Sequence, residues 1–188
     1  MKNILYINAC CRENSRTDEL AKHLLGTLSG NVQKVSLYEA NISPMDAELL
    51  SKRDGLLKND MKDDELFSLA KQFASADTIV IGAPYWDLMF PSVLKVYLEN
   101  ITVCGITFRY SDKGIPQSLC RAKNLYYVTT AGGFIGENNF GFDYIKAIAK
   151  GFFGIDNVKF FSAEGLDIYG ADVDKILCEA KNKINGMI

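Results

Sequence analysis

The chain has 188 residues, with 21 Lys and Arg against 23 Asp and Glu, so its formal net charge is −2. This length fits one domain over residues 1–188, and the mixed, near-neutral charge argues against nucleic acid or an anionic membrane surface as a partner. No apolar run reaches the roughly 18 to 20 residues that a membrane-spanning helix needs, and the apolar stretch at the start is too short for a secretory signal, so we expect a cytoplasmic protein.

Strand-like and helix-like segments alternate along the chain. Apolar runs typical of buried strands occur at residues 4–7, 32–37, 78–81, 125–129 and 158–161. Helical periodicity predicts helices over 18–28, 65–76 and 173–184, and helices also fit 92–102 and 142–152. Strands that alternate with helices imply right-handed crossovers and a parallel sheet covered on both faces. The predicted architecture is a three-layer α/β sandwich.

The segment from 39 to 62 breaks this alternation. It contains Pro44 and several charged residues, and we expect it to be irregular. Irregular segments of this length usually cover a site or an interface, so this one is a candidate lid or dimer contact. In open parallel sheets, ligands bind beyond the carboxyl ends of the strands, where strand order reverses. We therefore look for function in the loops after the first, third and fourth strands.

The loop after the first strand reads NACCRENSRTDEL and suits a phosphate group. Ser15, Thr17 and the backbone amides at the start of a helix offer hydrogen-bond donors, and Arg12 and Arg16 add positive charge. The helix dipole also favours an anion at this end. The alternative is that Ser15 only caps the helix, with Asp18 completing a weak capping box, while the arginines are solvated.

The loop after the third strand, APYWDLMFP, is unusually aromatic for a connection. Tyr85 and Trp86 offer a wall on which a flat ring can stack, and Pro84 and Pro91 restrict the path of the loop. The alternative is that the loop folds onto its own core or onto a second subunit. Both interpretations can hold together.

The loop after the fourth strand, VTTAGGF, has paired glycines. Thr130, Ala131, Gly132 and Gly133 allow close approach of the backbone and positive φ, so their amides can face the polar edge of a ligand. A tight turn into the next helix is the alternative. Because the topology brings all three loops to one end of the sheet, a phosphate site, an aromatic wall and a polar edge together indicate FMN.

These motifs resemble the FMN-dependent NADH azoreductases and related NAD(P)H:quinone reductases with the flavodoxin-like fold. The resemblance covers nearly the whole chain, from KNILYINA through VTTAGGF and GFFGIDNVKFFSAEGLDIYG to the last helix. Its most specific part is APYWDLMFPSVLKVYLENITVCGITFRY, with the aromatic loop, an L-K pair and G-x-T-F-R-Y. The fold that it implies has a five-stranded parallel sheet in the order 2-1-3-4-5 with helices on both faces.

The resemblance also implies a homodimer with FMN at the subunit interface. Ser15 and Thr17 would hold the phosphate, and Gly132 and Gly133 would lie along the flavin edge. The ring would lie against Pro84, Tyr85, Trp86, Asp87 and Leu88. Cys10 stands where the family commonly has a phosphate-binding serine, and Asp87 stands where it usually has an asparagine. A carboxylate beside a ring that becomes anionic on reduction is unfavourable unless it is protonated or turned away.

The implied reaction is a two-step transfer. NADH or NADPH passes hydride to flavin N5 and leaves, and a quinone, azo dye or nitroaromatic then takes its place and accepts two electrons, which is a ping-pong scheme. The resemblance implies no catalytic side chain, because the cofactor carries the chemistry. No metal site is expected.

Three alternatives stay open. Cys10 with Arg16 and Thr17 forms C-x5-R-T, the thiolate loop of low-molecular-weight phosphatases and arsenate reductases, although no proline follows an aspartate as their acid loop requires. The chain also fits a flavodoxin-type electron carrier, although such carriers are usually strongly acidic. The third is a flavin-free binding or regulatory protein on the same scaffold. The five cysteines are odd in number and lack metal-type spacing, which indicates reduced thiols.

Overall fold

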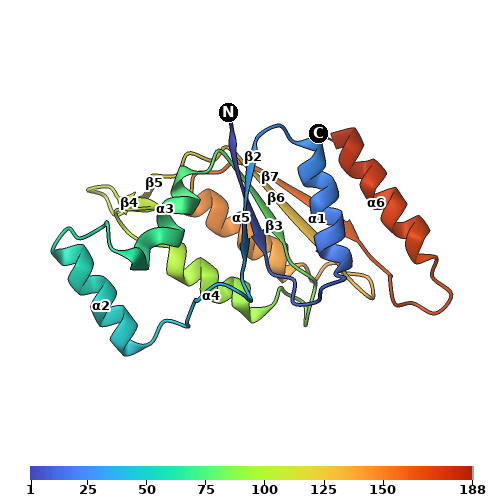
Figure 1. Ribbon diagram of the computed structural model, residues 1–188, viewed down its shortest axis with the longest axis horizontal. Helices are drawn as coiled ribbons and strands as arrows, with labels where there is room; N and C mark the ends of the chain where they lie inside the picture. Colours follow the sequence, from blue (N-terminus) through green and yellow to red (C-terminus); the bar gives the residue numbers. More distant parts are fainter. Residues whose placement is uncertain (188) are drawn as a thin grey trace.

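The computed structural model describes residues 1–187, which form a three-layer α/β sandwich (Figure 1). The central sheet has five parallel strands, β1 (Asn3–Asn8), β2 (Asn31–Ser36), β3 (Thr78–Gly82), β6 (Asn124–Thr130) and β7 (Asn157–Ala163). Their spatial order is β2-β1-β3-β6-β7, which confirms the predicted order 2-1-3-4-5. The order reverses between β1 and β3, so the loops after these two strands diverge at one edge of the sheet.

Helices cover both faces of the sheet (Figure 1). One face carries α1 (Arg16–Thr27) and α6 (Val173–Met187), and the other carries α3 (Ser68–Ser75), α4 (Ser92–Ile101) and α5 (Phe140–Gly151). A short 3-10 turn, η1 (Glu65–Phe67), precedes α3, so the predicted helix over 65–76 is divided into two pieces. Lys181 pairs with Glu19 at 2.5 Å and joins α6 to α1.

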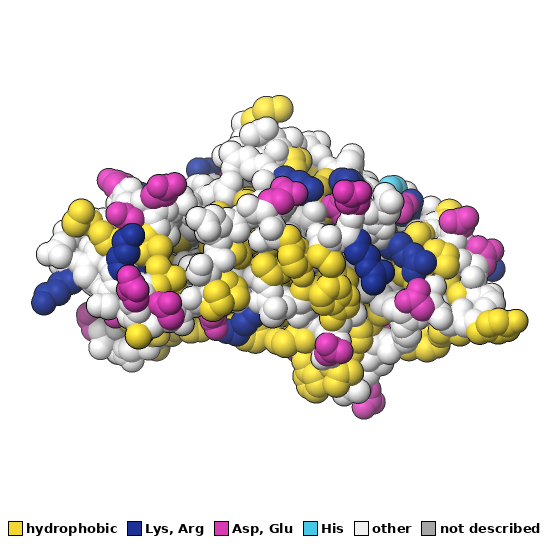
Figure 2. Space-filling model, turned by 60° about the horizontal axis from the view of Figure 1, so that its bottom comes forward, with side chains coloured by type: hydrophobic (Ala, Val, Ile, Leu, Met, Phe, Trp, Pro, Cys, Tyr) yellow, Lys and Arg dark blue, Asp and Glu magenta, His cyan; other side chains and the backbone are white. Residues whose placement is uncertain are grey.

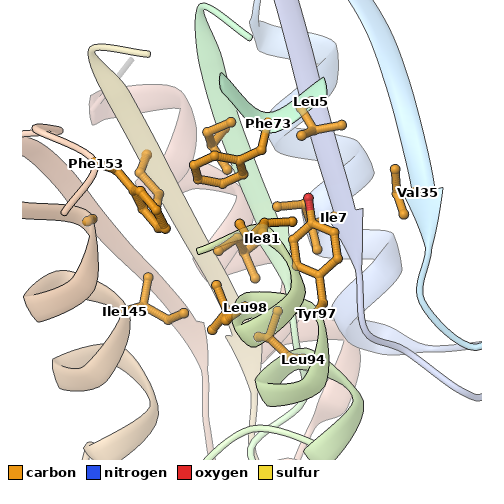
Figure 3. Close-up of a cluster of buried hydrophobic side chains, with 14 of the residues drawn as sticks. Leu5, Ile7, Val35, Phe73, Ile81, Leu94, Tyr97, Leu98, Ile145 and Phe153 are labelled. Atoms are coloured by element: carbon orange, nitrogen blue, oxygen red, sulfur yellow. The ribbon is translucent and has the colours of Figure 1, made fainter. Parts of the chain in front are cut away.

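The hydrophobic core lies on both sides of the sheet because side chains alternate along each strand. Leu5 and Ile7 face the α3, α4 and α5 layer, whereas Ile4 and Tyr6 face α1 and α6. Figure 3 shows part of the first cluster, with the Tyr97 ring of α4 beside Ile7 and its hydroxyl oxygen pointing into the apolar side chains.

Two parts of the fold differ from the sequence-based prediction. The segment predicted to be irregular contains α2 (Ala47–Lys58), whose N-cap Asp46 accepts a hydrogen bond from the Leu49 amide at 2.8 Å. None of the α2 residues is buried, and the helix projects from the sandwich (Figure 1). A two-stranded antiparallel hairpin, β4 (Phe108–Tyr110) and β5 (Pro116–Ser118), lies outside the central sheet and was not predicted.

The strand predicted over 32–37 is less buried than a continuous apolar run implies. β2 lies at the edge of the sheet, and within it only Val35 is buried. In the part of the chain that the structure describes, no helix has the length and apolar character needed to cross a membrane.

Candidate functional site

A pocket of about 340 Å³ lies where β1, β3, β6 and β7 end. Its walls come from residues 10–12, 14–17, 84–86, 130–132 and 166–167. The predicted residues that line it are Cys10, Arg12, Ser15, Arg16, Thr17, Pro84, Tyr85, Trp86, Thr130, Ala131 and Gly132, whereas Asp87, Leu88 and Gly133 do not. The topology therefore brings the three predicted loops together.

The start of α1 forms the polar end of this pocket. Ser15 is the N-cap: its hydroxyl accepts from the Asp18 amide at 3.3 Å, and its carbonyl accepts from the Glu19 amide at 3.0 Å. Within residues 1–187, the amides of Arg16 and Thr17 have no acceptor, which is usual for the first turn of a helix. These amides and the positive end of the helix dipole make a site that suits an anion.

Arg16 forms an ion pair across the pocket. Its Nη1 lies 2.9 Å from Oδ1 of Asp167, which belongs to the loop after β7. Sequence reasoning missed this loop, and therefore also Leu166 and Asp167, because function was expected only after the first, third and fourth strands. The signal that could have found them is the position of EGLDIYG directly after the fifth strand, since parallel strands all end at one edge.

The loop after β6 differs from its prediction in its backbone angles. Neither Gly132 nor Gly133 has positive φ, and their carbonyls accept from the Asp167 amide at 2.9 Å and the Gly165 amide at 2.9 Å. The missing side chain matters at Gly132 because a Cβ there would lie 2.5 Å from a carboxylate oxygen of Asp167. The glycine thus makes room for the Asp167 side chain.

A contact between Thr17 and Thr130 joins the start of α1 to the end of β6. Their hydroxyl oxygens are 2.6 Å apart, and Thr17 is buried. The Thr17 hydroxyl is therefore engaged with β6, and its amide, without an acceptor among residues 1–187, is the group of this residue left to bind an anion.

The aromatic loop forms a tight hairpin beside the pocket. The backbone groups of Trp86 and Met89 bond to each other at 2.9 and 2.8 Å, and the two residues between them, Asp87 and Leu88, both have positive φ, 48° and 68°. This is the geometry of a type I′ turn, which for a residue such as leucine costs about 1 to 2 kcal/mol. The Tyr85 hydroxyl donates to the Asn138 carbonyl at 2.9 Å, and this hydrogen bond joins the aromatic loop to the loop after β6.

The loops that form the pocket carry exposed apolar side chains. Trp86 is 41 % exposed, Leu88 47 % and Phe134 76 %. Figure 2 shows hydrophobic side chains gathered across the middle of this face, with basic side chains next to them. Asp87 is exposed at the hairpin tip and is not among the residues that line the pocket.

Cys10 lines the pocket as a neutral thiol. Burial raises the pKa of this thiol to about 11, although the Ser15 hydrogen bond lowers it, and its Sγ lies 3.7 Å from the Gly82 carbonyl oxygen. A thiolate phosphatase needs the opposite shift, because only the ionised sulfur attacks phosphorus. The structure therefore disfavours the C-x5-R-T interpretation.

Comparison with known proteins agrees with this geometry. A family profile described as the flavodoxin-like fold matches residues 2–187. An FMN-dependent NADH:quinone oxidoreductase of Clostridium beijerinckii is 34 % identical over 192 residues, covering 97 % of this chain and 96 % of that protein. The protein of the same name from Coprothermobacter proteolyticus is 32 % identical over 191 residues, covering 96 % and 94 %.

The chain belongs to the flavodoxin-like FMN-dependent NADH:quinone oxidoreductase family. Solved structures share the fold of this family member. An azoreductase from Bacillus anthracis superposes with a TM-score of 0.84 at 21 % identity, over 99 % of this chain and 98 % of that one. An FMN-dependent NADH-azoreductase from the same species, in complex with FMN, gives 0.82 at 24 % identity, over 99 % and 97 %.

Proposed function

We propose that this protein binds FMN in the pocket at the end of the sheet and transfers electrons from NADH or NADPH to small aromatic acceptors. It is an oxidoreductase, like the quinone oxidoreductases to which it is related. The observation that supports the cofactor assignment is the adjacency, in one pocket, of free amides at a helix N-terminus and a flat aromatic wall.

The residues of the pocket fit the parts of FMN. The amides of Arg16 and Thr17, the Ser15 hydroxyl and the Arg16 side chain would hold the phosphate, since they combine donors with positive charge. Pro84, Tyr85 and Trp86 would support the ring. The remaining predicted contacts that line the pocket are Cys10, Arg12, Thr130, Ala131 and Gly132. Asp87, Leu88 and Gly133 lie outside this wall.

When bound, FMN supplies the two-electron chemistry, taking hydride from the nicotinamide at N5 and reducing a quinone, azo compound or nitroaromatic. The protein's part is to orient the ligands and exclude water, and the scheme assigns no side-chain acid or base. The two substrates use the same exposed face in turn, so we propose ping-pong kinetics. Parallel lines in double-reciprocal plots of NADH oxidation at several menadione concentrations test this, and converging lines would contradict it.

A homodimer completes the proposed site. The pocket is at the small end of the range for cofactor sites, about 300 to 1,000 Å³, and the loops that form it carry the exposed side chains of Trp86, Leu88 and Phe134. A second subunit would cover this apolar rim and enclose the ring. The projecting α2 is a second candidate contact, because none of its residues is buried in the single chain. Cytoplasmic location stays a prediction from sequence.

The cofactor assignment is tested by Ser15→Asp. Aspartate caps a helix as well as serine does, so α1 should persist while the new charge repels the phosphate. We expect the Kd for FMN, measured by quenching of flavin fluorescence, to rise at least about tenfold. Ser29→Asp, at an exposed serine just after α1, is the matched control and should bind FMN like the wild type. Full flavin retention by Ser15→Asp would show that the phosphate lies elsewhere.

A further inference from the structure

A buried carboxylate lies beneath the first loop, outside the pocket lining. Asp18, on the first turn of α1, is only 7 % exposed. Its Oδ1 accepts from the Tyr6 hydroxyl at 2.6 Å and from Asn8 Nδ2 at 3.2 Å, and its Oδ2 lies 2.7 Å from Lys22 Nζ. The carboxylate therefore gathers donors from β1 and from the next turn of α1.

The charge of Asp18 is opposed to the proposed ligand. Desolvation acts to raise the pKa of Asp18, but hydrogen bonds from Lys22 and Tyr6 outweigh it and hold the pKa below its ordinary value. An ionised carboxylate in the first turn of α1 repels a phosphate bound at that helix end. Its presence under an anion site calls for a role other than direct attraction.

Asp18 controls the orientation of the Asn8 side chain. An ionised carboxylate only accepts hydrogen bonds, so the amide nitrogen of Asn8 must face it and the amide oxygen must face the other way. That oxygen, Oδ1, accepts from the Cys10 backbone amide at 2.9 Å. The direction of the chain as it leaves β1 and enters the first loop is thus set through Asn8 by Asp18.

The other end of the same loop is also tied to Asp18. The Asp18 amide donates to the hydroxyl of the N-cap Ser15, with 3.3 Å between the nitrogen and the oxygen. The loop over 10–15 is therefore held at its entry through the Asp18 side chain and at its exit through the Asp18 backbone. The segment between these ties faces the pocket.

We infer that Asp18 is a positioning residue for the phosphate: it does not contact FMN, but through Asn8 it holds the first loop in the shape that receives the phosphate group. This inference rests on the proposed function. Removal of the Asp18 side chain affects phosphate binding in two opposite ways, one through loop orientation and one through charge. Loss of the loop geometry weakens phosphate binding, whereas loss of a negative charge alone strengthens it.

Titrations of the flavin-free protein with FMN and with riboflavin, which lacks the phosphate, separate these effects. We expect Asp18→Ala to raise the Kd for FMN at least about tenfold and to leave the Kd for riboflavin within about twofold. A merely structural role would weaken both ligands alike. Asp77→Ala removes a carboxylate that accepts from the Asn3 amide at 2.9 Å, at the opposite end of the sheet from the pocket, and should change neither Kd.

Asn8→Ala should reproduce the selective loss of FMN affinity. If both residues act through one chain of hydrogen bonds, Asp18→Ala combined with Asn8→Ala should weaken FMN by much less than the product of the two single effects. Asp18→Asn, which keeps an acceptor for Asn8, should fall between wild type and Asp18→Ala, and it serves if the alanine variant does not fold.

Three results would overturn the inference: unchanged FMN affinity in Asp18→Ala and Asp18→Asn, tighter FMN binding in these variants, or an equal loss for riboflavin. Failure of the wild type to bind FMN would instead overturn the proposed function. The two failures are therefore distinguishable.

Discussion

Two buried tyrosines offer a matched test of the hydrogen bonding around the first loop. Tyr6 and Tyr97 are both almost fully buried, and each has a raised pKa caused mainly by desolvation. They differ in the hydroxyl group. That of Tyr6 donates to Asp18 at 2.6 Å, whereas that of Tyr97 has no hydrogen-bond partner among residues 1–187. Replacing each by phenylalanine removes only the hydroxyl.

The structure predicts that the two substitutions act differently on the free energy of unfolding. A hydrogen bond to a charged group contributes about 1.5 to 3 kcal/mol, so Tyr6→Phe should lower the free energy of unfolding by about 2 kcal/mol. A buried hydroxyl without a partner costs about 1 to 3 kcal/mol, so Tyr97→Phe should leave stability unchanged or raise it by up to that amount. For a domain of this size, a loss of 2 kcal/mol lowers Tm by about 4 to 8 °C.

Urea unfolding of the flavin-free protein, followed by far-UV circular dichroism, measures both variants. Flavin must be absent because a ligand that binds only the folded state adds to its apparent stability. The m-value should stay constant, so that a change in midpoint reports stability. Equal destabilisation by the two substitutions would refute the reasoning, because it would mean that the bond between Tyr6 and Asp18 contributes nothing beyond packing.

Further predictions concern the same region. Gly82→Ala should lower the free energy of unfolding by about 1 to 3 kcal/mol, because its Cβ would lie 2.8 Å from the Tyr6 hydroxyl oxygen. Gly133→Ala is the control, because a Cβ there would have nothing within 4 Å. Equal urea midpoints for the two variants would contradict this prediction. The pKa of the Cys10 thiol is about 11, so the rate of its alkylation by iodoacetamide should rise about tenfold per pH unit above pH 7. Peptide mass mapping measures this rate. A rate that reaches a plateau near neutral pH would support the thiolate hypothesis instead. Hydrolysis of p-nitrophenyl phosphate should likewise be undetectable. The folded-state pKa of Asp18 lies below its ordinary value of about 3.9, so its ionisation stabilises the fold above that pH and the benefit disappears as pH falls through the folded pKa. The stability difference between wild type and Asp18→Asn should shrink over that acid range in urea titrations, and a pH-independent difference would be inconsistent with this shift.

The central fold could be predicted because its signals are local. Period-two and period-3.6 patterns mark strands and helices within short windows, and the crossover rule then determines how parallel strands are joined. The prediction failed where local pattern is weak or ambiguous. α2 buries no residue and so carries no clear apolar stripe, while β4 and β5 are three residues each, too short for a periodic signal.

The sequence by itself determined which loops meet, because parallel strands all present their carboxyl ends at one edge. Only the tertiary structure decided which side chains of these loops form ion pairs and hydrogen bonds with one another. Arg16 and Asp167 are 151 positions apart, and the pair depends on the separate turns that aim their side chains. The same holds for the buried contacts of Asp18 with Tyr6 and Asn8, which belong to a different element. Hydrogen bonds and ion pairs need atoms placed to within a few tenths of an ångström, and that precision arises only when the whole core has packed.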